Sequence, residues 1–354
     1  MIMTRLDYFA NYPLHRQAYD FLSAAKLPNT NPFSLADSKH TKAQLEILQA
    51  FFGVEFVQFF GCTTEDFVTL FLKLRNNEIF LMPSFSQQAY KSFELITDIH
   101  KINANNLAHF TRKNTQKPCY IFLPYINEDI LSYNDFCGIA QRLDSLNAVL
   151  LVEISRLLQN ADLHSLQALQ KLHHKRVALV LNAENVGLPR RYGIIAHSLP
   201  ELAQSLDSLV PNGFFEALNL CLQGIAKDNA LRDYLATFPN APFYETLQNE
   251  LAQSVSLFTP ISSCPPNALA LRLFGAKARV LAQNLLIENV SVINGQECLL
   301  GNFKPSFVLG EMGYGENECR ELLSISFVHL DKGTLQECAR KIARAYNSFK
   351  ALGI

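Results

Sequence analysis

The chain has 354 residues, which is more than one small hydrophobic core organises, so two domains are expected. Hydrophobic residues make up 49% and charged residues 18%, as in a soluble globular protein with a large buried core. The formal net charge of −1 gives no electrostatic basis for binding nucleic acid or a membrane surface. No apolar run reaches the roughly 18–20 residues that span a bilayer, and the first residues lack a signal-peptide core, so a cytoplasmic location is expected.

Short apolar runs recur along the chain with helical stretches between them. In chain order, we expect strands at residues 56–59, 78–82, 120–123, 148–153, 176–181 and 192–197. Continuous apolar runs of this length are typical of strands buried on both faces, and their alternation with helices indicates βαβ units. The predicted fold class is α/β, with a mostly parallel mixed sheet flanked by helices.

Two capping-box patterns predict helix starts. Thr41 with Gln44 opens one helix, for which Gly53 offers a stop, and Thr334 with Glu337 opens another near the C-terminus. The second helix is expected to bury one apolar face, formed by Cys338, Ile342, Tyr346 and Phe349.

Polar, proline-containing stretches at residues 228–243 and 259–267 are interpreted as a linker and a surface turn. This predicts a large α/β domain at residues 14–235. A smaller α+β domain is expected at residues 236–354, with residues 1–13 joining it.

The eight cysteines include no C-x-x-C pair, so neither a zinc ribbon nor a redox pair is indicated. The adjacent His173 and His174 side chains point apart on a helix or strand, which makes a poor metal site. We predict no metal site.

Several segments carry a family resemblance when they are taken in order. Residues 6–13 read L-D-Y-F-A-N-Y-P, residues 59–65 read F-F-G-C-T-T-E, and residues 295–313 read G-Q-E-C-L-L-G-N-F-K-P-S-F-V-L-G-E-M-G; Asn31-Pro32 with Ser34 falls between the first two. They resemble segments of the cysteine desulfurases and other class V aminotransferase-family proteins, which read L-D-N-A-A-T-T-P, F-T-S-G-A-T-E, G-S-A-C-S-S-G-x-x-x-P-S-H-V-L-x-A-M-G and N-P-S-S. This resemblance implies the fold type I architecture of pyridoxal phosphate (PLP) enzymes and a homodimer.

The same resemblance places an asparagine where the family has its cofactor lysine. Residues 178–193 read A-L-V-L-N-A-E-N-V-G-L-P-R-R-Y-G and are similar to the family's S-x-H-K-x-x-G-P-x-G. Gly187 and Pro189 keep their places, but Asn185 replaces the lysine, and an amide cannot form an imine with an aldehyde. In an alternative register Lys171 or Lys175 takes the role, although Lys175 precedes the expected strand rather than following it.

Other cofactor positions implied by the resemblance are also altered. Glu153 stands for the aspartate on the pyridine nitrogen, Arg156 for a glutamine that touches the ring oxygen, and Gln87 for the ring-stacking histidine. Glu153 and Arg156 have an alternative reading as a structural ion pair.

The implied phosphate-binding site is half preserved, and the implied substrate-carboxylate contact is lost. Thr64 matches the phosphate-binding threonine, with helix capping as its alternative role. Asn182 and Glu184 replace a serine and a histidine. Ser326 stands for the substrate-carboxylate arginine, and a serine lacks the bidentate guanidinium.

Cys298 lies where desulfurases carry the nucleophile that takes sulfur as a persulfide. The neighbouring Glu297 favours the neutral thiol, so a cysteine without any role is the alternative.

Joint loss of the lysine, histidine and arginine predicts a cysteine desulfurase-like protein without PLP catalysis, with PLP absent or held non-covalently. Its expected role is that of a binding or regulatory partner, with an active desulfurase or an iron–sulfur scaffold protein as the partner in sulfur transfer. One alternative is an active PLP enzyme that uses an unrecognised lysine. Another is a cleft of Glu153, Arg156, Glu184 and Arg190 repurposed for a different small molecule.

Overall fold

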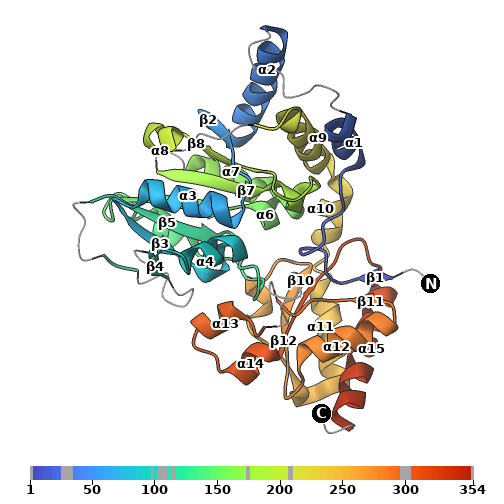
Figure 1. Ribbon diagram of the computed structural model, residues 1–354. Coiled ribbons are helices and arrows are strands. Elements are labelled where there is room, and N and C mark those ends of the chain that lie inside the picture. The colour runs from blue at the N-terminus through green and yellow to red at the C-terminus, as the bar shows by residue number, and fades with distance from the viewer. Residues whose placement is uncertain are drawn as a thin grey trace.

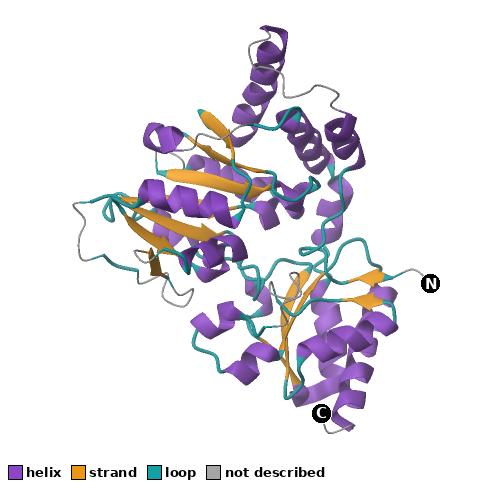
Figure 2. Cartoon of the chain, viewed as in Figure 1, coloured by secondary structure: helices purple, strands orange, loops and turns teal. Residues whose placement is uncertain are grey.

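The computed structural model describes residues 3–24, 35–96, 99–102, 110–112, 117–172, 176–205, 210–295 and 304–351. Asn31, Pro32, Lys175 and Cys298 lie outside these residues. The chain forms an upper region around a large sheet and a lower region around a small one, and both are covered by helices (Figures 1 and 2). No helix within the described residues is long and apolar enough to cross a bilayer.

Within the described residues, a seven-stranded sheet forms the upper region, with the order β2-β8-β7-β6-β5-β3-β4. Its strands are β2 (Phe56–Phe59), β3 (Glu78–Leu81), β4 (Ile99–Lys101), β5 (Cys119–Pro124), β6 (Ala148–Glu153), β7 (Val177–Asn182) and β8 (Gly193–His197). The strands from β4 to β7 are parallel to their neighbours, whereas β8 runs antiparallel to both β7 and β2. The predicted mostly parallel mixed sheet is confirmed, and each of the six expected strands is present.

Helices cover both faces of this sheet, because alternate residues of each strand point to opposite sides. On one face, Phe122 of β5 packs in a cluster with Phe67 and Phe71. On the other face, Ile121 and Leu123 belong to a second, larger cluster. The helices of the upper region are α1 (Arg16–Ala24), α2 (Leu35–Phe52), α3 (Thr64–Leu74), α4 (Gln87–Phe93), α5 (Phe136–Ala140), α6 (Ser155–Gln159), α7 (Leu163–Lys171), α8 (Pro200–Ser205), α9 (Phe214–Lys227) and α10 (Asn229–Leu235).

The lower region has a core of its own. Within the described residues, an antiparallel sheet has the order β12-β10-β9, formed by β9 (Val255–Leu257), β10 (Ala268–Leu273) and β12 (Leu322–Ser326). The chain's start returns to this region, because β1 (Thr4–Arg5) pairs in parallel with β11 (Val290–Ser291). The helices here are α11 (Asn240–Leu251), α12 (Ala278–Ile287), α13 (Phe307–Glu311), α14 (Glu316–Arg320) and α15 (Lys332–Ala351). We keep the division at residue 236 as a proposal that the separate hydrophobic cluster supports.

Both capping-box predictions misplaced the helix start. Helix α2 begins at Leu35, so Thr41 is an exposed residue inside it rather than its cap. Helix α15 begins at Lys332, and the Asp331 carboxylate accepts the Thr334 backbone N–H at 2.9 Å. The expected apolar face of α15 is buried. The predicted linker at residues 228–243 was also largely wrong, because helix α10 and the start of α11 occupy it.

Candidate functional site

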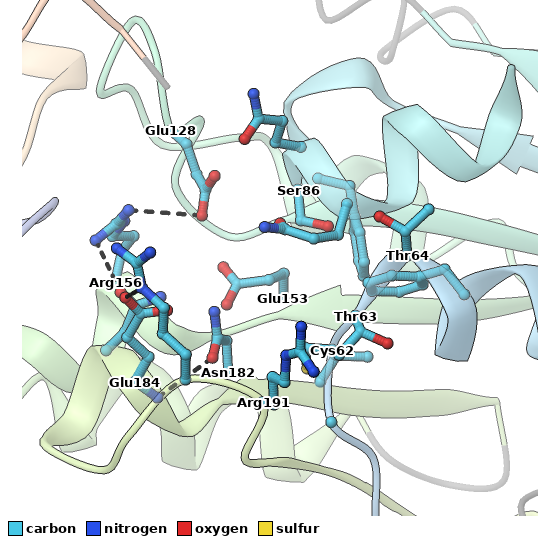
Figure 3. A pocket seen from close by; sticks show the side chains of 18 of the residues that line it. Cys62, Thr63, Thr64, Ser86, Glu128, Glu153, Arg156, Asn182, Glu184 and Arg191 are labelled. Carbon is cyan, nitrogen blue, oxygen red and sulfur yellow. Dashed lines mark hydrogen bonds and ion pairs between the residues drawn. The ribbon is translucent and has the colours of Figure 1, made fainter. Parts of the chain in front are cut away.

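A pocket of about 310 Å³ opens at the carboxyl edge of the large sheet. Its wall takes Thr63 from the loop after β2, Ser86 after β3, Glu128 after β5 and Arg156 after β6 (Figure 3). Asn185, after β7, also lines it. Parallel strands deliver all their carboxyl-end loops to one edge, which is where open α/β sheets bind ligands. At about 310 Å³ it is at the small end of the range for ligand pockets, about 300–1,000 Å³.

All six residues predicted from the cofactor resemblance line this pocket. They are Thr64, Gln87, Glu153, Arg156, Asn182 and Asn185. The fold therefore brings together side chains that are up to 121 positions apart in the sequence, from 64 to 185. That these residues bind a cofactor stays a prediction, and Cys298 lies outside the described residues.

Arg156 is the centre of a buried polar network. Its Nη2 lies 3.6 Å from Glu128 Oε1, and its Nη1 donates to Gln159 Oε1 at 2.9 Å and to Asn185 Oδ1 at 3.3 Å. The guanidinium also lies over the Phe9 ring, 5.6 Å from its centroid. The ion-pair partner that the structure gives Arg156 is thus Glu128, not the Glu153 that the alternative reading suggested.

Glu153 points into the open middle of the pocket, between Glu128 and Asn182 (Figure 3). Its Oε1 accepts the Ser155 backbone N–H at 2.9 Å, whereas its Oε2 has no hydrogen-bond partner among the described residues. Burial raises the pKa of Glu153, and the contacts with Ser155 and Arg156 oppose that shift.

Burial also raises the pKa of Glu128, to about 8, with Arg156 opposing the shift and Glu153 adding to it. Two buried carboxyl groups therefore share one guanidinium. Because burial and the charge of Glu153 both disfavour its ionised form, Glu128 keeps its proton near neutral pH. The three groups Glu128, Glu153 and Arg156, which form the inner wall of the pocket, then have no net charge.

The first turn of helix α3 already holds two carboxylates. The Asp66 carboxylate accepts the Thr63 backbone N–H at 3.1 Å, and Thr63 Oγ accepts the Asp66 backbone N–H at 3.2 Å. A hydrogen bond from its own backbone N–H lowers the pKa of the exposed Glu65, with a second from the Thr63 side chain. The helix cap is therefore Thr63, and the predicted Thr64 is the first helical residue. Helix N-termini favour anions, and here the chain's own anions take that place.

The rim of the pocket carries paired charges. Glu184 Oε1 lies 2.9 Å from Arg190 Nε, and the Asn182 Oδ1 accepts the Glu184 backbone N–H at 3.2 Å. The following turn needs glycine at residue 187, where φ is +104° and a Cβ would lie 3.0 Å from the His15 backbone nitrogen. This requirement explains why Gly187 keeps the place it has in the family pattern.

Ser326, at the position of the family's carboxylate-binding arginine, has a structural contact. It lies in β12, and its Oγ accepts the Phe9 backbone N–H at 2.8 Å. It is absent from the lining of the pocket as the described residues form it.

The pocket's residues do not fit PLP held through an imine. Its described lining includes no lysine, and Lys171 ends helix α7 ahead of β7, at the opposite edge of the sheet. A phosphate dianion would also meet Glu65, which sits at the α3 terminus, and Glu184. Among the described residues, no three His, Cys, Asp or Glu side chains are grouped to hold a metal ion.

Sequence reasoning missed Ser86, Gln88 and Arg191, which also line the pocket. Ser86 and Gln88 lie at the start of α4, after a short 3-10 helix that follows β3, and Arg191 lies two residues before β8. A scan of the polar residues in the loops at this edge would have found Ser86 and Arg191, because those loops converge in a parallel sheet, whereas Gln88 lies within α4.

Comparisons with known proteins agree with this architecture. No family model and no curated protein matches the chain by sequence. A solved NifS-like protein superposes with a TM-score of 0.74 at 14% identity, covering 98% of this chain and 100% of that one. The cysteine desulfurase CsdA from Escherichia coli gives 0.66 at 12% identity, covering 98% and 95%. A serine palmitoyltransferase from S. paucimobilis, solved with a bound PLP–myriocin aldimine, gives 0.65 at 12%, covering 99% and 88%. The fold of PLP-dependent transferases such as the cysteine desulfurases, predicted from the resemblance, is thus confirmed.

Proposed function

We propose that this protein is a cysteine desulfurase-like binding protein that does not use PLP imine chemistry. The observation that carries the proposal is the contact between Arg156 and Asn185, whose Oδ1 accepts from the guanidinium at 3.3 Å. A lysine at residue 185 would place a second cation beside that guanidinium. The chain instead has a neutral amide that serves as an acceptor.

The electrostatics of the pocket support the same proposal. The described lining has four carboxyl groups, those of Glu65, Glu128, Glu153 and Glu184, and three guanidinium groups, those of Arg156, Arg190 and Arg191. With Glu128 protonated, the three other carboxylates equal the three guanidinium groups in number. A cofactor with a phosphate dianion needs an excess of positive charge or free backbone N–H donors.

Its role, in this proposal, is to bind or regulate a partner in sulfur transfer or iron–sulfur assembly. The partner would be an active desulfurase or a scaffold protein, and the protein itself would be a homodimer. Cys298 is the candidate sulfur acceptor, and it lies outside the described residues. Mass spectrometry for a persulfide on Cys298, after incubation with an active desulfurase and cysteine, tests the acceptor role, with Cys298→Ser as the control.

The competing function is an active PLP enzyme with an unrecognised lysine. Incubation of the purified protein with PLP, followed by borohydride reduction and peptide mass spectrometry, separates the two. We expect no internal-aldimine absorption band and no reduced adduct concentrated on one lysine, whereas a bona fide desulfurase treated in parallel gives both. A stable adduct on a single lysine, with release of sulfide or alanine from cysteine, would overturn the proposal.

A further inference from the structure

The pocket contains buried polar atoms that the protein leaves without partners. Among the described residues, these include Gln87 Nε2, Glu153 Oε2 and Arg156 Nε. The three residues are 5%, 3% and 5% exposed, and each lines the same pocket. A buried polar atom without a hydrogen bond is destabilising, and native proteins retain few of them. Three around one cavity point to a missing molecule that supplies the partners.

The chemistry of the three atoms defines what that molecule presents. Arg156 Nε and Gln87 Nε2 are donors and call for two acceptor oxygens. Glu153 Oε2 is a carboxylate acceptor and calls for an N–H or O–H donor. A simple amide supplies one strong acceptor and one donor site, which leaves one of the two protein donors without an oxygen of its own.

The charges on the wall restrict the ligand further. The inner pair Glu128 and Glu153 balances Arg156, and on the rim Glu65 and Glu184 balance Arg190 and Arg191. Neither a net anion nor a net cation gains from a wall without net charge, because desolvation of an ion needs compensation. An uncharged ligand avoids that cost.

Apolar side chains also contribute to the wall, among them Phe67, Phe85 and Val180. These side chains suit the face of a small ring, and the pocket volume of about 310 Å³ accommodates one ring with a short substituent.

We propose that the pocket binds an uncharged cyclic imide or ureide, whose N–H donates to Glu153 and whose two carbonyl oxygens accept from Arg156 and Gln87. This inference rests on the proposed function, because it requires the pocket to be free of an imine-bound cofactor. The N–H of an imide is polarised by the carbonyls on both sides, so its hydrogen bond to a carboxylate is charge-assisted.

Ligand-observed saturation-transfer NMR and calorimetry on the full chain test the proposal with small probes. Succinimide carries one N–H and two carbonyl oxygens, and uracil carries the same group on a larger ring. We expect both to bind, and we expect N-methylsuccinimide and 1,3-dimethyluracil, which lack the donor, to lose binding. Inorganic phosphate, a net anion, and L-alanine, a zwitterion with two ionised groups, are the comparisons and should not compete.

Variants assign the binding to this pocket. Glu153→Gln and Gln87→Leu should each weaken succinimide binding by about tenfold or more, since each removes one of the paired contacts. Glu316→Gln, the same chemical change at an exposed carboxyl group of α14, should leave binding unchanged. Should one pocket variant fail to fold, the other variant and the methylated probes on the unaltered protein still decide the question.

Absence of binding by both imides would overturn the inference, as would equal binding of the methylated probes or preferential binding of alanine or phosphate. The PLP reduction assay separates this failure from a failure of the proposed function. No adduct together with no imide binding rejects the ligand class alone, whereas a lysine adduct rejects both.

Discussion

Two buried polar clusters in this protein differ in how completely they are paired. Around Asp7, which is 2% exposed, both carboxylate oxygens have partners: Arg5 Nε at 2.9 Å, Asn11 Nδ2 at 2.7 Å and Ser291 Oγ at 2.8 Å. Around Arg156, three equally buried residues keep atoms without partners. The first cluster fixes the chain's start against the lower region. The second lines a pocket, and its atoms without hydrogen-bond partners indicate a ligand-binding site rather than a purely structural contact.

The largest loss of stability is expected when the central cation of the second cluster is removed. Arg156→Met removes the guanidinium that lies 3.6 Å from Glu128 and opposes the raised pKa of Glu153, and loss of one partner from a buried pair costs about 3–5 kcal/mol. We expect this loss near pH 8, where Glu128 ionises, and a smaller loss near pH 5, where Glu128 is protonated. Urea unfolding at the two pH values measures it, and an equal loss at both would contradict the charge-sharing account.

The paired cluster should respond differently. Asp7→Ala removes the acceptor of several donors, and we expect a loss of about 1–3 kcal/mol in the free energy of unfolding. Imide binding should persist, because Asp7 does not line the pocket. Urea unfolding and the NMR binding assay on the same sample check both parts. Loss of binding in a folded Asp7→Ala protein would show that the two clusters are coupled.

The effect of Glu128→Gln on stability should depend on pH. The folded-state pKa of Glu128, about 8, lies above its ordinary value of 4.5. Its contribution to stability is therefore full below pH 4.5 and is lost as the pH rises through about 8, because the unfolded state binds fewer protons in that window. We expect the melting temperature of Glu128→Gln, relative to the unaltered protein, to increase as the pH rises from about 4.5 to 8.

The contribution of His197 to stability depends on pH with the opposite sign, and its pH range overlaps the lower part of the range for Glu128. Burial lowers its pKa to about 4, and its stabilising contribution is lost as the pH falls from 6.5 towards 4. Comparing each variant with the unaltered protein at the same pH removes this shared background. A constant difference between Glu128→Gln and the parent across the range would contradict the raised pKa.

The smallest effect is expected at an exposed ion pair. Arg320 Nη2 lies 2.6 Å from Glu316 Oε1 on α14, and the two side chains are 36% and 70% exposed, respectively. Arg320→Ala should change the free energy of unfolding by less than about 0.5 kcal/mol, because water and salt screen such pairs. Thermal unfolding at low and high salt measures this. A loss comparable to that of Asp7→Ala would show that burial does not separate these clusters.

Much of the large sheet was predictable, because its strands are buried on both faces and so read as continuous apolar runs. In β5, for example, all six residues are buried. The three-residue β4, with two exposed positions, has no such run and was missed. Helix starts were predicted less well, because a capping pattern such as Thr41 with Gln44 recurs inside helices, and only the hydrogen bonds reveal which residue caps.

From the sequence alone came six of the seven described strands of the large sheet and the residue types at its carboxyl edge, including Asn185 and Glu153. Their joint placement in one pocket also followed from the family resemblance. Only the tertiary structure decided the partners: Arg156 pairs with Glu128 rather than with Glu153, and Thr63 rather than Thr64 caps α3. Partner choice depends on where loops from different strands meet. No local periodicity carries that information, since the pairing atoms come from segments brought together by the packing of the whole sheet.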